Sequence, residues 1–83
     1  MKKILLDTRE MEHPLPLQLA LNHLQKITIN EYLYMIHRKK PLPLLEVAKE
    51  KAFSCITHKD INDTWHILIS KNNEKNLEEL LDV

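Results

Sequence analysis

The sequence predicts one small α/β domain, a two-layer sandwich with the element order β-α-β-α-β-β, whose mixed four-stranded sheet carries two helices on one face. Three observations predict it. The 83 residues are one domain's worth of chain. Apolar runs typical of strands alternate with two segments whose apolar residues recur at helical spacing. Both of those segments begin with the same tetrapeptide, Pro-Leu-Pro-Leu, at residues 14–17 and 41–44.

The first half of the chain predicts a strand, a helix and a strand. Residues 4–6 are a short apolar run bounded by charge, which indicates a buried strand, and the polar residues 7–13 follow as a loop. Proline is favoured at the first position of a helix because its missing N–H costs nothing there. Residues 15–26 then have apolar residues at helical spacing, and residues 31–37 are almost all apolar or strand-forming. The second strand is therefore expected inside the sheet.

The second half predicts a helix, a hairpin and a tail. A basic loop over residues 37–40 precedes a second helix, which Pro41 opens and which ends near Phe53. Residues 54–58 and 64–71 predict two antiparallel strands joined by a turn rich in Asp and Asn. Residues 1–71 are thus expected to form the domain. In the extension, residues 72–83, leucines at helical spacing predict either a short helix capped by Asn72 or Asn73, or a frayed end.

This order of elements places both Pro-Leu-Pro-Leu segments together. Two strand–helix units predict parallel pairing of the first two strands with right-handed crossovers. Both loops then lie at the same edge of the sheet, where α/β folds usually bind ligands. The chain has no glycine. Backbone positions with φ > 0 are therefore expected at asparagine or aspartate, which tolerate that region, and the candidates are Asn30, Asn62, Asn72 and Asn73.

Composition excludes several classes of protein. Acidic and basic residues balance at 12 each, which argues against binding duplex nucleic acid. The single cysteine, Cys55, allows no internal disulfide and fits a reducing compartment. No stretch approaches the roughly 20 apolar residues of a membrane span. The apolar run at residues 4–6 is too short for a secretory signal, so a cytoplasmic protein is expected.

Residues 6–16 resemble the opening of TusA/SirA-like sulfur-carrier proteins. In that family Leu-Asp-x-Arg-Gly precedes Cys-Pro-x-Pro at the start of the first helix. The matching residues are Asp7, Arg9, Pro14 and Pro16. Residues 30–31 resemble the family's Gly-Glu before the second strand, and residues 67–71 resemble its last strand.

Two departures from that pattern bear on function. Glu10 replaces the usual glycine, and His13 replaces the cysteine that carries persulfide sulfur. With the second Pro-Leu-Pro-Leu segment, the chain resembles a cysteine-less branch of the TusA/SirA-like superfamily whose function is unknown. The resemblance implies partners among sulfur-transfer enzymes or redox proteins.

The basic residues at the predicted loop edge are the candidate binding residues: Arg9, His13, Arg38, Lys39 and Lys40. They flank two helix N-termini, where backbone N–H groups and arginine suit phosphate, sulfate, thiosulfate or a partner's carboxylates. The alternative is a solvated basic loop in which Arg9 pairs with Asp7 or Glu12. His13 is expected as a ligand, a proton carrier or an anion contact, or as an exposed loop histidine.

Three other groups of residues show weaker signs of a function. His58 and His66 are equidistant from Asn62 and face each other in a symmetric hairpin, but two ligands make an incomplete zinc site, and a polar outer face is expected. Cys55 is expected as a small buried apolar residue rather than a nucleophile. The strand aromatics are expected in the core rather than as a surface for stacking bases: Tyr32, Tyr34 and Trp65.

The sequence therefore favours a non-catalytic binding or adaptor protein whose basic loop edge holds a small anion or a partner protein. Two alternatives remain open. One is a sulfur carrier that uses Cys55 as a relocated thiol, and the other is a nucleic-acid-binding module. No catalytic residues, metal, cofactor or membrane contact is expected.

Overall fold

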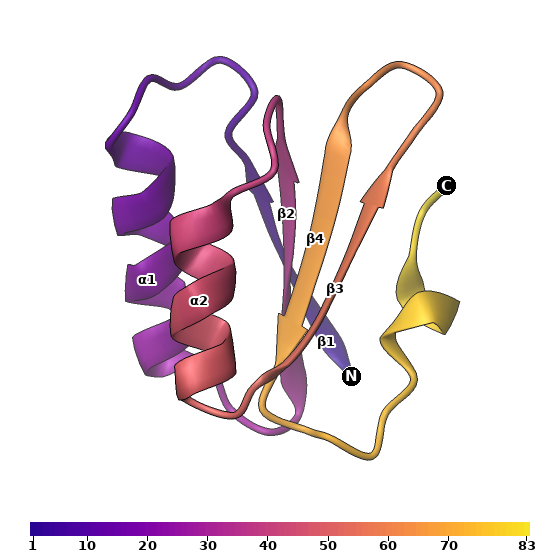
Figure 1. Cartoon of the computed structure of the whole chain (residues 1–83). Coiled ribbons are helices and arrows are strands. Elements are labelled where there is room, and N and C mark those ends of the chain that lie inside the picture. The colour runs from indigo at the N-terminus through magenta and orange to yellow at the C-terminus, as the bar shows by residue number, and fades with distance from the viewer.

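Four strands form one mixed sheet, and two helices pack on one of its faces (Figure 1). The computed structural model describes residues 1–83. The strands are β1 (Lys2–Asp7), β2 (Glu31–His37), β3 (Ser54–Lys59) and β4 (Trp65–Ser70), in the spatial order β1-β2-β4-β3. The helices are α1 (Leu15–Lys26) and α2 (Leu42–Glu50), followed by one 3₁₀ turn, η1 (Leu77–Leu80). β1 pairs parallel with β2, and β4 pairs antiparallel with β2 and β3, which confirms the predicted fold class.

The larger core lies between the helices and the sheet. The alternation of β2 and β4 sends every second residue towards the helices. The sheet contributes Leu33, Met35, Ile67 and Ile69. The helices contribute small and branched side chains at their buried positions: Ala20, Leu24, Leu44 and Ala48. Neither helix is long and apolar enough to cross a membrane.

The C-terminal segment covers the opposite face of the sheet (Figure 1). Leu77 of η1 packs on a second, smaller core formed by Tyr32, Tyr34 and Leu68. Of the two outcomes expected for residues 72–83, the structure shows the packed short helix. The predicted cap is wrong, because the Asn76 side chain accepts a hydrogen bond from the Glu78 N–H at 3.1 Å and so starts the turn later.

The four asparagine candidates for φ > 0 are wrong, but the expectation of an asparagine or aspartate at such a position is met by Asp63. Ala52 and Asp63 have φ values of 59° and 63°, and no asparagine does. α2 ends at Glu50 rather than near Phe53. The Ala52 N–H donates to Lys49 O at 3.0 Å and the Phe53 N–H to Ala48 O at 2.9 Å, which is the Schellman pattern. That pattern requires a left-handed residue directly after the cap, and the length of the helix places an alanine there.

Candidate functional site

The loops that follow β1 and β2 enclose a cleft of about 300 Å³ at one end of the sheet. Because β1 and β2 are parallel, their carboxyl ends meet at this edge, and α1 and α2 begin side by side there (Figure 1). Both Pro-Leu-Pro-Leu segments contribute to the wall: Pro16, Leu17, Pro41, Pro43 and Leu44. The predicted meeting of the two loops at one edge is therefore confirmed.

Neither helix has a side-chain cap at the cleft. Pro14 and Pro41 occupy the N-cap positions, and the first turn of each helix contains no acidic residue. A helix N-terminus carries a partial positive charge from its unpaired N–H groups. Two such termini therefore point the same sign of charge at one cleft, with no carboxylate in either first turn to neutralise it.

The repeat leaves the equivalent backbone donor free in each helix. The second residue of each Pro-Leu-Pro-Leu segment donates its N–H group to a loop carbonyl at 3.0 Å: Leu15 to Glu12 and Leu42 to Lys40. The third residue of each repeat is proline and has no N–H. The fourth residues, Leu17 and Leu44, thus carry the first unpaired helical N–H groups, and both residues border the cleft. Leu17 is partly exposed there, whereas Leu44 is fully buried beneath it.

Arg38 ties the two loops together. Its Nη2 donates to the Met11 carbonyl at 2.9 Å and lies 3.8 Å from the Glu12 carboxylate. The guanidinium has five N–H donors, so most of them stay available to a ligand. Since Arg38 is half-exposed, its ion pair with Glu12 contributes little by itself. Its position at the mouth of the cleft matters more than that pairing.

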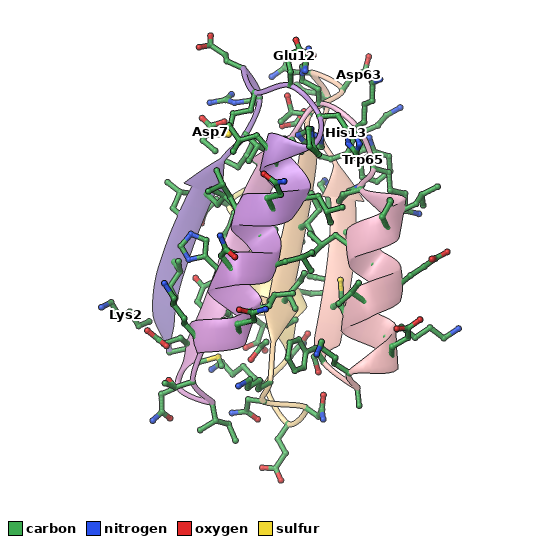
Figure 2. All side chains as sticks on the ribbon, turned by 90° about the vertical axis from the view of Figure 1, so that its left-hand side faces the viewer. Lys2, Asp7, Glu12, His13, Asp63 and Trp65 are labelled. Atoms are coloured by element: carbon green, nitrogen blue, oxygen red, sulfur yellow. The ribbon has the colours of Figure 1, made fainter.

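His13 lies exposed at the wall of the cleft, directly before the cap of α1. Figure 2 shows it at the same end of the molecule as Glu12 and Trp65, and far from Lys2. The peptide bond between His13 and Pro14 is cis.

Four of the five predicted binding residues line the cleft: His13, Arg38, Lys39 and Lys40. The Lys40 ammonium also lies 5.5 Å from the centre of the Trp65 ring. Arg9 lies outside the cleft and pairs with Asp7, with Nη2 at 2.6 Å from Oδ2. This hydrogen-bonded pairing lowers the pKa of the Asp7 carboxyl. It is the local contact that the sequence left open as an alternative.

His37 lines the cleft and was not singled out from the sequence. It is the last residue of β2, and its Nδ1 lies 2.8 Å from the hydroxyl of Thr8. Burial, together with the charges of Arg38 and Lys39, lowers the pKa of the imidazole from 6.5. A signal existed: alternation along residues 31–37 puts His37 on the same face as Met35, at the carboxyl end of an interior strand.

The predicted register of the hairpin histidines is confirmed, but their polar outer face is not. His58 pairs with His66 and is exposed, whereas His66 is 7% exposed. The His66 ring binds the Tyr34 hydroxyl at 2.7 Å through Nδ1 and the Asp60 carboxylate at 2.9 Å through Nε2. The same hydroxyl accepts from the Asp82 N–H at 2.9 Å. This network joins hairpin, sheet and tail, and no three metal-binding side chains cluster anywhere in the protein.

The thiol behind the first alternative function and the two tyrosines behind the second are poorly exposed. Cys55 packs against the larger core, and burial raises the pKa of its thiol to about 11. A thiol with so high a pKa is almost wholly protonated at neutral pH and is a weak nucleophile. Tyr32 and Tyr34 are buried in the smaller core, so neither ring offers a free face for stacking bases.

Fold and cleft together define a small two-layer α/β protein with a basic cleft where two helices begin. The chain belongs to the family described as Uncharacterized conserved protein (DUF2249), whose family model matches residues 5–71. That range holds both helices and nearly the whole sheet, and it ends before the segment that covers the second face. No curated protein and no solved structure matches the chain.

Proposed function

We propose that this protein is a non-catalytic binding or adaptor protein that holds an oxyanion, or a carboxylate of a partner protein, in the basic cleft. The observation that carries the proposal is the convergence of two uncapped helix N-termini on one cleft. The N–H group of the partly exposed Leu17 and the half-exposed Arg38 supply donors that a ligand can reach. The N–H group of Leu44 also has no acceptor in the protein and adds its dipole from below, since Leu44 is fully buried.

The charges around the cleft favour an anion. Its lining holds three cationic side chains, Arg38, Lys39 and Lys40, against one carboxylate, Glu12, a surplus of two positive charges with neutral histidines. A hydrogen bond to a charged group contributes about 1.5–3 kcal/mol. Two or three of them, less the cost of ordering the ligand, correspond to a dissociation constant on the order of 0.1–1 mM for a small anion.

The resemblance to TusA/SirA-like carriers indicates the kind of partner. His13, which stands where the resemblance places the sulfur-carrying cysteine, lines the cleft, and this supports our proposal of partners in sulfur transfer or redox metabolism. The lone cysteine suits the reducing cytoplasm as the place of action. His13 cannot hold a persulfide, and the high pKa of Cys55 weighs against a relocated thiol. Binding without covalent chemistry is the function that fits both residues.

Amide NMR shifts of the protein titrated with phosphate, sulfate and thiosulfate test the proposal. Saturable shifts are expected for residues 11–17 and 37–44, which surround the cleft. The variant Arg38→Ala should weaken binding about tenfold because a charged donor is lost. Arg9→Ala is the matched control, since Arg9 lies outside the cleft and is paired with Asp7. An equal loss in both variants, or no shift at all, would overturn the proposal.

A further inference from the structure

The ring of His37 is fixed in one tautomer by Thr8. The Thr8 side chain is fully buried, and its Oγ1 lies 2.8 Å from the Ile36 carbonyl and 2.8 Å from the Nδ1 of His37. Two oxygens at that separation need a proton between them, and the carbonyl has none. The hydroxyl therefore donates to Ile36, so it can only accept from His37. Nδ1 carries the proton of the neutral ring.

The other ring nitrogen is then a hydrogen-bond acceptor that faces the cleft. In the neutral ring with a proton on Nδ1, the Nε2 atom has a lone pair and no proton. Nε2 makes no hydrogen bond within the protein, and the protein has no buried side-chain nitrogen or oxygen without a partner. Nε2 must therefore be accessible, and the cleft is the space that His37 lines.

We propose that His37 makes the cleft select oxyanions that carry a proton, inorganic phosphate above all, over sulfate, which carries none. The inference rests on the proposed anion-binding function and adds its specificity. Phosphate at neutral pH keeps a P–OH group, which donates to Nε2 while the charged oxygens accept from the N–H group of Leu17 and from the Arg38 guanidinium. Sulfate has the same shape and only lone pairs, so one of its oxygens would face the lone pair of Nε2.

The size of the preference follows from that one hydrogen bond. Leaving a partly buried acceptor opposed by a second acceptor loses the bond and the solvation of Nε2, which corresponds to about 10- to 100-fold in affinity. The other side chains with titratable groups that line the cleft are Glu12, His13, Arg38, Lys39 and Lys40. None of them has the contact with Thr8 that fixes the proton of His37 on Nδ1. When the pH falls below the lowered pKa of His37, Nε2 becomes a donor and the preference for phosphate should shrink.

Calorimetric titration at pH 7.5 and constant ionic strength, with phosphate and with sulfate in parallel, tests the inference. Phosphate should bind about 10- to 100-fold more tightly. In His37→Gln the preference should vanish, because an amide presents either a donor or an acceptor. His13→Gln is the matched control, a histidine of the same cleft without the Thr8 contact, and it should keep the preference.

Each outcome bears on a different claim. Equal binding of both anions by the unaltered protein overturns the selectivity and leaves the proposed function standing, whereas no binding of either overturns both. A preference that survives in His37→Gln shows that another group is responsible. Long-range ¹H–¹⁵N spectra of the unaltered protein provide a readout that needs no variant: a proton on Nε2 of neutral His37 would refute the argument at its first step.

Discussion

The Tyr34 hydroxyl holds the C-terminal segment to the sheet, and Tyr34→Phe removes it while keeping the ring. The side chain is 1% exposed, and its hydroxyl accepts from the Asp82 N–H and binds the Nδ1 of His66. The substitution removes two hydrogen bonds of about 1 kcal/mol each and leaves the buried Nδ1 of His66 without its partner. We expect the free energy of unfolding to fall by about 2–3 kcal/mol, and Tm by roughly 10–20 °C.

Urea unfolding followed by circular dichroism measures this loss, and Tyr32→Phe is its matched control. Tyr32 is also buried, at 6% exposure, in the same small core, but its hydroxyl has no hydrogen-bond partner in the protein. Its substitution should change stability by less than about 0.5 kcal/mol. Hydrogen exchange of the Asp82 amide should accelerate in Tyr34→Phe alone. Equal losses in the two variants would refute the network as the reason for stability.

Three further substitutions or reactions test other parts of the structure. Ala52→Gly should stabilise the protein by about 0.5–1 kcal/mol, because glycine adopts φ > 0 without steric cost, and a loss in urea unfolding would contradict the assigned helix end. Cys55 should react with iodoacetamide at pH 8 far more slowly in the folded protein than in urea, and equal rates would exclude its raised pKa. The hydrogen bond with His66, and then that from the Thr64 N–H, lower the pKa of Asp60 from 3.8. Its contribution to the stability of the folded protein is therefore present above pH 3.8 and is lost as the pH falls through the lower pKa of the folded state. Asp60→Asn should therefore destabilise the protein more at pH 6 than at about pH 3, and an equal loss at both would refute the sign.

The elements could be predicted because their signals are local. Residues 15–26 and 31–37 match α1 and β2, since an apolar stripe at helical spacing and a run of strand formers depend only on neighbouring residues. The place of the cleft could also be predicted, by one further inference from the order of the elements. Parallel pairing of the first two strands is enough to bring both Pro-Leu-Pro-Leu segments to one edge, whatever their side chains do.

The chemistry within the cleft depends on register, which no local pattern reveals. The bond between Thr8 and His37 joins residues 29 positions apart. It forms because β1 pairs with β2 so that Asp7 lies opposite Ile36. The residue after each of these, Thr8 and His37, then comes into contact. The pairing of His66 with His58 was predicted, but its burial was missed, because its two partners come from the hairpin turn and from a different strand. Ala52 was missed because the lack of glycine pointed to asparagine or aspartate, whereas the end of α2 fixes the position with φ > 0.

The unpaired amides of Leu17, partly exposed at the cleft, and of Leu44, buried beside it, report most directly on an anion in the cleft. In ¹⁵N-leucine-labelled protein, phosphate should shift both amide signals along saturable curves that share one dissociation constant. The amide of Leu77, in the segment that covers the other face of the sheet, should stay in place. Unmoved signals from Leu17 and Leu44, or two different dissociation constants, would contradict a single anion held between the two helices.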